Sequence, residues 1–279
     1  MIWLSHFQAS VLRETFTIKE NSVKVSLDLG ITESIVKLEQ GKFIFPDMQS
    51  LALEDIESII SSKNVCFLVE DNIVKKIQLY SAKTKRFYKL YPTSINTPPT
   101  VEISGIRMHS VKDIEPYKDA MDKVNAIKPI KGRILDTCFG LGYTSIMASK
   151  FTDVYSFEVD ENILDIAKHN PWSKYAFISD KIYLKNGDIE EEIREINEEF
   201  FDGIIHDPPS FKICSKLYTE NFYKELFRVL NSKGRLYHYI GNPSGKYRGR
   251  NLEKGVVNRL RNVGFRVIRK IAKGVVVVK

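Results

Sequence analysis

From Lys131 to the C-terminus, short apolar segments alternate with segments whose apolar residues recur at helical spacing. This pattern predicts a parallel β-sheet covered by helices on both faces. The expected strands are residues 133–138, 153–158, 181–186, 201–206, 234–240, 265–270 and 274–279, and the expected helices are residues 163–170, 189–200, 219–230 and 253–263. Only the short turn IAKG separates the last two strands, so we expect the sheet to end in an antiparallel hairpin.

Up to about Pro99 the pattern consists of short alternating segments split by polar turns. Residues 14–29, 34–47 and 65–80 each fit two strands around a turn, and residues 51–62 fit a helix. We therefore expect a small α+β domain over residues 1–100. The proline-containing segment 91–105 is expected to be a linker, and residues 113–127 a helix that leads into a second domain over residues 101–279.

Composition narrows the class of protein. The chain has 279 residues, of which 43% are hydrophobic, enough for one large domain or two smaller ones. No apolar run approaches the roughly 18 residues that a membrane span needs, and the opening MIWLSHFQAS lacks the basic start of a signal peptide, so we expect a cytoplasmic protein with no membrane partner. The three cysteines show no CxxC spacing, which argues against a disulfide framework and a cysteine zinc site.

The net charge of +7 is concentrated near the C-terminus. Residues 211–279 hold 17 Lys and Arg against 3 Asp and Glu, whereas residues 1–100 hold 12 against 11. Such a concentration is typical of a protein that binds a polyanion, although a solvated surface would also explain it. Lys246, Arg248 and Arg250 lie with a tyrosine among glycines in the run GKYRGRN, and this composition favours a nucleic acid.

The expected strand ends carry polar residues, and such ends bind ligands in open α/β sheets. The first strand ends in LDTCFGLGYTS, where Gly140 and Gly142 would let the backbone approach a ligand. Ser145 replaces the third glycine of a GxGxxG motif, which disfavours NAD, and a plain tight turn would explain the two glycines equally well. The next three strands end in Glu158, in NGD with Asp188, and in HDPPSF with Asp207.

The ordered set D-x-C-x-G-x-G-x-T, E-x-D, N-G-D and D-P-P-S-F resembles the class I S-adenosylmethionine (SAM)-dependent methyltransferases over about residues 101–279. The phrases SGIRMHS, LDTCFGLGYT, HNPWS, IIHDPPSF, FYKELFRVL, HYIGNP and YRGRN are similar to a little-characterised archaeal group of predicted methyltransferases. The resemblance implies a Rossmann-like, seven-stranded, mostly parallel sheet with an antiparallel terminal hairpin, and SAM as the cofactor. The cofactor-binding residues that it implies are Asp136, Gly140, Gly142 and Thr144 around the methionine part of SAM, Glu158 on the ribose and Asp188 on the adenine side.

Asp207, Pro208, Pro209 and Phe211 resemble the (D/N)PP(Y/F) box of enzymes that methylate amino groups on planar bases. Ser210 departs from that pattern, because it moves the aromatic residue one position later. In such a box the acid and a carbonyl of the proline loop accept hydrogens from the base amino group, and the aromatic ring stacks on the base. The alternative is structural: Asp207 would cap the following turn and Phe211 would belong to the core.

Three further residues near the box are weaker candidates. A covalent mechanism through Cys214 is disfavoured, because this cysteine follows Pro209 by five residues instead of lying in the box. His206 and His238 end two of the expected strands and could line a pocket, although a hydrogen-bonded structural histidine is the commoner case. No spacing of residues suggests a metal site.

We therefore expect a SAM-dependent methyltransferase that modifies RNA, with tRNA as the leading candidate, on a base amino nitrogen. One alternative is a transferase of the same fold that acts on a small amine or a protein. Another is an RNA-binding protein that keeps a relic of a cofactor fold. The acids at the strand ends disfavour the relic, and the basic C-terminal segment disfavours the small amine. The nucleotide, the role of residues 1–100 and the oligomeric state stay open.

Overall fold

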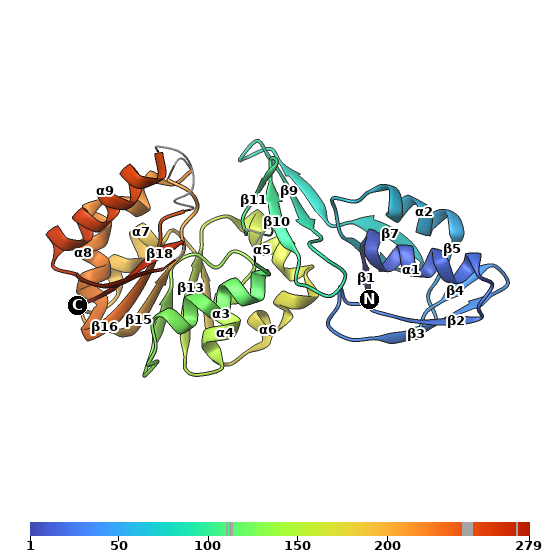
Figure 1. The fold of residues 1–279 in the computed structure, drawn as a ribbon, viewed down its shortest axis with the longest axis horizontal. Helices are drawn as coiled ribbons and strands as arrows, with labels where there is room; N and C mark the ends of the chain where they lie inside the picture. Colours follow the sequence, from blue (N-terminus) through green and yellow to red (C-terminus); the bar gives the residue numbers. More distant parts are fainter. Residues whose placement is uncertain (110, 112–113, 212, 242–247, 272) are drawn as a thin grey trace. The chain divides into compact units, whose positions relative to one another are not determined.

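The computed structural model describes residues 1–109, 111, 114–211, 213–241, 248–271 and 273–279 (Figure 1). By its contacts the chain divides into two compact units. The N-terminal unit consists of residues 1–117 and 162–174, and the C-terminal unit of residues 118–161 and 175–279. Residues 101–117 and 162–174 thus group with the N-terminal unit, and the separate roles expected for residues 1–100 and 101–279 stay a prediction.

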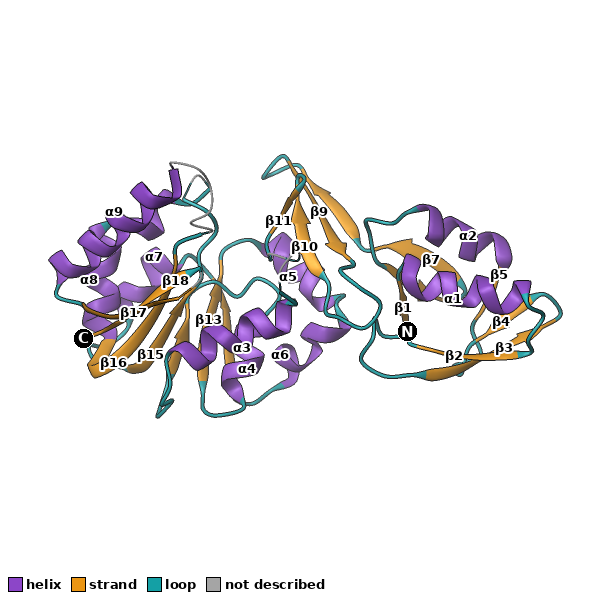
Figure 2. Ribbon diagram, in the orientation of Figure 1, coloured by secondary structure: helices purple, strands orange, loops and turns teal. Residues whose placement is uncertain are grey.

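One seven-stranded sheet forms the centre of the C-terminal unit, in the order β14-β13-β12-β15-β16-β18-β17 (Figure 2). Neighbouring strands from β14 to β16 are parallel, whereas β18 is antiparallel to both β16 and β17. The strands are β12 (Ile134–Asp136), β13 (Val154–Glu158), β14 (Ile182–Asn186), β15 (Phe201–His206), β16 (Leu230–Tyr239), β17 (Arg266–Ile271) and β18 (Gly274–Val278). The predicted class I fold with its antiparallel terminal hairpin is confirmed.

Helices lie on both faces of this sheet, with α3 and α4 on one face and α7, α8 and α9 on the other (Figure 2). The helical segments are α3 (Pro116–Ala126), α4 (Tyr143–Ser149), α6 (Lys174–Ile178), α7 (Ile189–Glu192), α8 (Glu220–Val229), α9 (Arg248–Val263) and the 3₁₀ turns η2 (Ile193–Glu195) and η3 (Ser215–Tyr218). The segment predicted as one helix over 189–200 is therefore shorter and ends in a 3₁₀ turn.

The hydrophobic pattern explains why α8 packs where it does. Thr219 begins the helix, because its side chain accepts a hydrogen bond from the Phe222 amide at 3.3 Å. Phe222, Leu226 and Val229 follow at helical spacing and are buried against the sheet, together with Leu236 of β16. The opposite side of the helix carries its charged residues. This apolar stripe therefore packs α8 against the face of the sheet formed by β15 and β16.

Three small antiparallel sheets form the N-terminal unit, in the orders β1-β6-β7, β2-β3-β4-β5 and β11-β10-β9-β8. The strands are β1 (Ile2–Leu4), β2 (Ser22–Val25), β3 (Ser34–Glu39), β4 (Lys42–Ile44), β5 (Ser50–Ala52), β6 (Phe67–Glu70), β7 (Ile73–Lys76), β8 (Gln78–Ser81), β9 (Arg86–Tyr91), β10 (Thr100–Ile103) and β11 (Ile106–Arg107). The helical segments are α1 (His6–Thr17), α2 (Leu53–Ser61), α5 (Glu161–Lys168) and the 3₁₀ turn η1 (Pro171–Ser173). The α+β character expected for the N-terminal half is confirmed.

Strands β1, β5, β9 and β11 of this half were not predicted from the sequence, and two of the expected segments differ from the structure. The segment starting at Glu14 was expected to be a strand, but it belongs to α1, which continues to Thr17. The expected linker 91–105 contains β10, which pairs with β9 and β11 as the third strand of a sheet. The prolines lie before this strand and leave its amides free to pair.

Residues 162–174 group with the N-terminal unit, and two tryptophan side chains connect them to it by hydrogen bonds. The indole nitrogen of Trp3 donates a hydrogen bond to the His169 carbonyl at 2.8 Å. The indole nitrogen of Trp172 donates to the Leu29 carbonyl at 3.0 Å.

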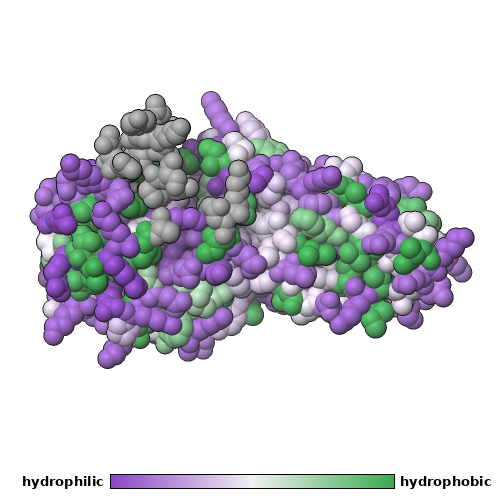
Figure 3. Space-filling model, viewed as in Figure 1, coloured by the Kyte–Doolittle hydropathy of each residue, from purple (hydrophilic) through white to green (hydrophobic). Residues whose placement is uncertain are grey.

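The surface visible in Figure 3 mixes hydrophilic side chains with small hydrophobic groups. Within the described residues, no helix combines the length and the apolar character that crossing a membrane would require.

Candidate active site

Asp136 ends β12, an inner strand of the large sheet, and is fully buried. Its Oδ2 atom accepts hydrogen bonds from the hydroxyls of Thr144 and Ser145, each at 2.7 Å. Its Oδ1 atom is buried, and no hydrogen bond to it is found among the described residues, although the Cys138 amide lies close enough to the carboxyl group to lower its pKa. Burial raises the pKa of Asp136 to about 6, because it outweighs the hydroxyl hydrogen bonds that favour the carboxylate. An unpaired buried oxygen of this kind is suited to a donor from a ligand.

The turn from β12 to α4 contains two glycines in the left-handed region, with φ of +57° at Gly140 and +75° at Gly142. A Cβ atom on Gly142 would lie 2.5 Å from the ring of Phe139, so packing requires this glycine. A Cβ atom on Gly140 would meet nothing within 4 Å. The open side of the turn is therefore at Gly140, where a ligand can approach the backbone closely.

Glu158 ends β13 and is only 7% exposed. Its Oε2 atom accepts a hydrogen bond from the Gly140 amide at 2.9 Å, and Oε1 accepts from the Asp160 amide at 3.0 Å. Burial raises the pKa of Glu158 to about 7 in spite of these bonds. Each oxygen keeps a second lone pair, so the carboxylate can also accept two hydroxyls of a ribose.

Asp188 follows β14 and begins α7, where its side chain accepts a hydrogen bond from the Glu190 amide at 3.1 Å. Lys216 on η3 forms ion pairs with Asp188 at 2.7 Å and with Glu190 at 3.0 Å. Hydrogen bonds to these two carboxylates raise the pKa of Lys216. Asp188 thus has structural partners of its own, and its contact with adenine stays a prediction.

Asp207 follows β15 and is paired with a buried lysine that the sequence analysis did not identify. Nζ of Lys123, on α3, lies 2.5 Å from Asp207 Oδ2 and 2.7 Å from Asp119 Oδ2, and the lysine side chain is 7% exposed. Burial alone would lower the pKa of Lys123, but the carboxylates of Asp207 and Asp119 outweigh it and raise the pKa. Lys123 therefore stays protonated and fixes the position of the Asp207 carboxylate.

Beyond Asp207 the chain leaves the sheet in a turn. Pro208 is buried, and the Pro209 carbonyl accepts a hydrogen bond from the Tyr218 hydroxyl at 3.0 Å. Phe211 is 42% exposed, and its ring meets that of Tyr218 edge-on, with 5.5 Å between centroids. Phe211 is thus not a core residue, and its ring is accessible for stacking. Among the described residues, Asp207 bonds to Lys123 and accepts nothing from the backbone of the turn.

His206 and His238 are buried and hydrogen-bonded within the core. His206 lies between the Thr137 hydroxyl at 2.8 Å and the Leu217 carbonyl at 3.0 Å. His238 lies between the Tyr223 hydroxyl at 2.7 Å and a backbone carbonyl at 2.6 Å. Carbonyls only accept, so one nitrogen of each ring carries the proton and the other accepts from the hydroxyl. Burial lowers the pKa of His206 to about 3 and that of His238 well below its usual value, which keeps both rings neutral.

The remaining candidates add little to the site. Burial raises the pKa of Cys214, which disfavours the thiolate that covalent catalysis needs. Within the described part of the chain, no three His, Cys, Asp or Glu residues are grouped so that they could hold a metal ion. Lys246 lies outside the described residues. Arg248 and Arg250 begin α9, and their side chains are not described.

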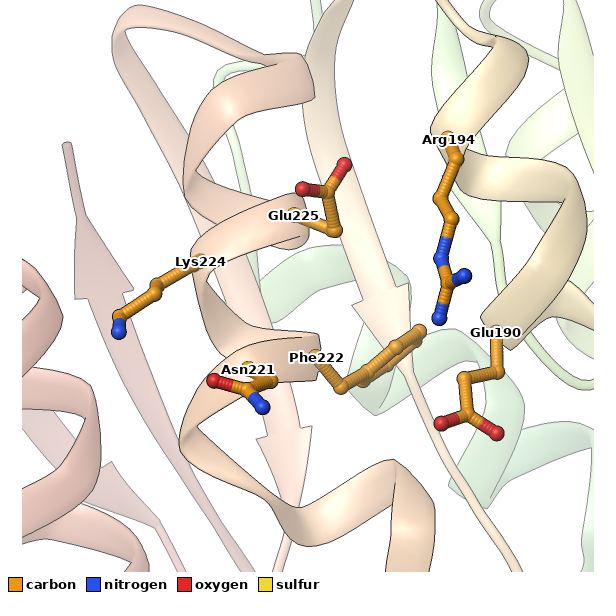
Figure 4. Close-up of a pocket in the computed structure, with 6 residues that line it drawn as sticks. All are labelled: Glu190, Arg194, Asn221, Phe222, Lys224 and Glu225. Atoms are coloured by element: carbon orange, nitrogen blue, oxygen red, sulfur yellow. The ribbon is translucent and has the colours of Figure 1, made fainter.

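A pocket of about 250 Å³ opens between α7 and η2 on one side and α8 on the other (Figure 4). It is lined by Glu190, Arg194, Asn221, Phe222, Lys224 and Glu225. None of the predicted site residues lines this pocket, so it is separate from the strand ends.

The candidate site is therefore the group of strand ends on β12, β13 and β15. Backbone pairing places Asp136 beside Ile205 of β15, and Gly140 joins Glu158 through its hydrogen bond. The negative charge of Asp207 contributes to the raised pKa of Asp136, which shows that the two carboxyl groups are close. A glycine turn open to a ligand, an unpaired buried oxygen and an acid with free lone pairs fit an adenosine cofactor with a polar tail.

Comparison with known proteins supports this interpretation of the site. A family model described as RNA cap guanine-N2 methyltransferase matches residues 131–212. The match begins just before β12, includes the glycine turn and ends with the proline box.

Relatives and solved structures match more of the chain. The uncharacterized protein MJ1233 of Methanocaldococcus jannaschii is 40% identical over 288 residues, which cover 100% of this chain and 97% of that protein. Spermidine synthase from Thermotoga maritima superposes with a TM-score of 0.57 at 17% identity, over 76% of this chain and 77% of that one. A spermidine synthase in complex with the transition-state analogue AdoDATO gives a TM-score of 0.59 at 17% identity, over 76% and 78%. At this identity the two synthases show a shared fold alone.

The sheet order establishes the class I fold, and the family model match lies on the strands that carry the site. The chain belongs to the same family as MJ1233, and it is a SAM-dependent methyltransferase of the class I fold.

Proposed function

We propose that this enzyme transfers the methyl group of SAM to an amino nitrogen of a base in cytoplasmic RNA, with tRNA as the leading candidate. The observation that carries the proposal is the Asp207 carboxylate, which is held by buried Lys123 and is followed four residues later by the accessible Phe211 ring. An acceptor beside an aromatic ring is the arrangement that a planar base with an amino group requires.

The proposed chemistry needs positioning more than a strong base. The lone pair of a base amino nitrogen is delocalised into the ring, which makes the nitrogen a poor nucleophile. A group that accepts hydrogen bonds from the amino hydrogens localises this lone pair and so favours attack on the methyl carbon. The nitrogen would form a bond to the methyl carbon while the bond from that carbon to sulfur breaks with its electron pair going to sulfur, and the proton that the nitrogen loses would pass to water. Asp207 Oδ2 is occupied by Lys123, so Oδ1 would accept from the amino group, and Phe211 would stack on the base.

We assign the cofactor to the other strand ends. SAM supplies the electrophilic methyl group. Asp136, with its unpaired Oδ1 atom, and the open Gly140 turn would bind the amino acid part, while Gly142 and Thr144 shape that turn. The carboxylate of Glu158 would accept the ribose hydroxyls, and Asp188 would lie on the adenine side.

RNA as the substrate is supported by the match to the RNA cap guanine-N2 methyltransferase family and by the charge of the chain. The segment 211–279 has 17 Lys and Arg against 3 acids. We include Lys246, Arg248 and Arg250 among its phosphate contacts, because cations among glycines can follow a nucleic acid backbone. The family match does not decide between cap, tRNA and other RNA.

The buried Lys123 also bears on the alternative substrate. A small amine or a lysine side chain is cationic, and it would approach Asp207 next to the ammonium group of Lys123. Lys123 offsets part of the negative charge of Asp119 and Asp207, so the site attracts a cationic amine less strongly than unpaired acids would, whereas the neutral amino group of a base needs no such attraction. This observation favours a base over a small amine.

Methyl transfer from SAM carrying a labelled methyl group to RNA from cells that lack the gene tests the proposal. Asp207→Ala should lower turnover by about 10²–10³ while SAM affinity is retained, since its carboxylate contacts the acceptor and not the cofactor. Phe211→Ala should instead weaken RNA binding by about 1–3 kcal/mol. Ser210→Ala is the control, because this exposed hydroxyl lies in the same box.

Normal turnover of Asp207→Ala would reduce the box to a structural turn. Transfer to a small amine such as spermidine, with none to RNA, would replace the proposal by the small-amine alternative.

A further inference from the structure

The β11-β10-β9-β8 sheet of the N-terminal unit has one face that is open to solvent on its β8 side, although Thr100 and Glu102 of β10 are buried on the same face. Side chains alternate between faces along a strand, and buried Tyr88 and Leu90 place the core on one side of β9. Phe87, Lys89 and Tyr91 lie on the other side. The pairing register adds Tyr80 of β8 opposite Phe87, and Glu102 of β10 with Arg107 of β11 opposite Lys89. We call this the aromatic face.

Two aromatic rings on this face are open to solvent. Tyr80 is 63% exposed and Phe87 is 39% exposed, and the register places them directly across from each other. Cross-strand neighbours have their Cβ atoms about 5 Å apart, so the two side chains form one continuous surface. Exposed aromatic rings on a sheet are suited to stacking with the bases of a single strand.

Arginine already stacks on the third ring. The Arg107 guanidinium carbon lies 3.9 Å from the centroid of the Tyr91 ring, and Arg107 also donates a hydrogen bond to the Tyr91 hydroxyl at 2.7 Å. Glu102, the acid of this face, is matched by Lys89 at 2.8 Å and by Arg107 at 3.4 Å. The face therefore offers planar groups and a net positive charge.

Cations lie beside the exposed rings. From Ile73 to Val101 the chain has six Lys and Arg and no Asp or Glu. Lys83 and Lys85 are exposed and lie in the turn that joins Tyr80 on β8 to Phe87 on β9, whereas Arg86 pairs with Ser81 and lies on the opposite face from Phe87. Phosphates next to stacked bases would meet the two lysines.

We propose that the aromatic face binds single-stranded RNA, with bases on Tyr80 and Phe87 and phosphates on the cations of the β8–β9 turn. The inference rests on the proposed function, in which RNA is the substrate, and gives the N-terminal unit a role in holding that RNA. Exposed aromatic rings also suit a protein partner, but the lysines in the turn beside Tyr80 and Phe87 match the phosphates of RNA, so we favour RNA. A duplex is disfavoured, because its stacked bases offer no free face to an aromatic ring.

Binding of the full-length enzyme to a labelled short single-stranded RNA of mixed sequence, and to its duplex, tests the inference. The double variant Tyr80→Ala/Phe87→Ala should bind the single strand about 100-fold more weakly, about tenfold for each lost stacking ring. Its KM for RNA in methyl transfer should rise, with kcat at saturation and SAM affinity unchanged. Ile35→Ala is the control, because it truncates an exposed apolar side chain on another sheet of the same unit.

The contribution of the lysines beside the aromatic face is measured by the salt dependence of RNA binding. Lys83→Ala/Lys85→Ala should lower the slope of log affinity against log salt by about one to two, as expected for the loss of one or two phosphate contacts. If this variant keeps its affinity for SAM, the change in salt dependence does not result from unfolding of the protein.

Two results would overturn the inference while the proposed function stands. One is methyl transfer to RNA with wild-type KM in the Tyr80→Ala/Phe87→Ala variant. The other is equal affinity for duplex and single strand. If the wild-type enzyme neither methylates nor binds RNA, the proposed function itself fails. Capture of a protein by wild type and not by the double variant, with RNA affinity equal in both, would assign the face to a protein.

Discussion

Glu158 and Asp136 are the residues whose charge is most sensitive to pH in the site. Burial raises the pKa of Glu158 to about 7 and that of Asp136 to about 6. The folded protein therefore holds protons on these groups that the unfolded chain has lost. Their contribution to folding stability is greatest at acid pH and is lost as the pH rises through 6 to 7. A ligand that binds the carboxylate form has the opposite pH dependence, because its affinity increases as the pH rises.

We predict that cofactor affinity rises with pH up to about 7, because a carboxylate accepts ribose hydroxyls more strongly than the neutral acid does. Below that pH the affinity should fall by up to about tenfold per unit. Calorimetry with methylthioadenosine measures this without interference, since that ligand keeps the ribose and lacks the titratable amino acid part. Glu158→Gln should bind weakly and independently of pH. A steep pH dependence in Glu158→Gln would exclude Glu158 as the titrating group.

Lys123 was not predicted, because a buried lysine depends on a partner distant in the sequence. Its spacing from Asp119 is visible as an i,i+4 pair, but Asp207 is 84 positions away and is brought to α3 only by the fold. The sequence motif thus identified Asp207 at the strand end, whereas only the structure identified Lys123 as the group that neutralises it.

Lys123→Met should destabilise the protein by about 3–5 kcal/mol, since it leaves two partly buried carboxylates without their shared cation. Denaturant unfolding measures the change. Lys224→Met is the matched control, because the Lys224 side chain is 60% exposed and its pair with Glu220 is a surface pair worth less than about 1 kcal/mol. Equal stability of the two variants would contradict the structural role of Lys123.

At the scale of elements, the pattern of the C-terminal half sufficed to predict every strand of the large sheet. Strands buried on both faces, such as β12 and β18, appear as short apolar runs, and the helices between them have clear amphipathic stripes. In the N-terminal half α1 was missed, because Thr15, Phe16 and Thr17 alternate as a strand would. A capping signal was available: the Ser5 side chain accepts from the Phe7 amide and the Gln8 side chain from the Ser5 amide.

The turn from β12 to α4 allows two glycines to be compared. Gly140→Ala should cost about 1–2 kcal/mol of stability from its positive φ alone, and should strongly reduce SAM affinity by filling the open side of the turn. Gly142→Ala should cost more stability, because its Cβ atom would also collide with the Phe139 ring. Thermal unfolding and calorimetry measure the two effects. If Gly140→Ala bound SAM normally, the cofactor would not approach this turn.

At the scale of the whole molecule, the positive charge is divided between two kinds of segment. The basic stretch at 211–279 was evident from the sequence, whereas the first 100 residues are nearly balanced, with 12 Lys and Arg against 11 acids. The stretch from Ile73 to Val101 nevertheless has six Lys and Arg and no acid, and the structure places Lys83 and Lys85 of this stretch in the turn next to the exposed rings of Tyr80 and Phe87. An average over a domain conceals such a local concentration, and only the strand register shows which side chains share a face.

The central claim is that the enzyme methylates a base amino nitrogen in RNA through Asp207. Nucleoside mass spectrometry of RNA from cells with and without the gene tests it most directly. We predict that one nucleoside methylated on an amino nitrogen disappears without the gene, and returns when the wild-type gene is restored but not when Asp207→Ala is supplied. An unchanged set of RNA nucleosides, or the loss of a methyl group from a ribose or a ring carbon, would contradict the claim.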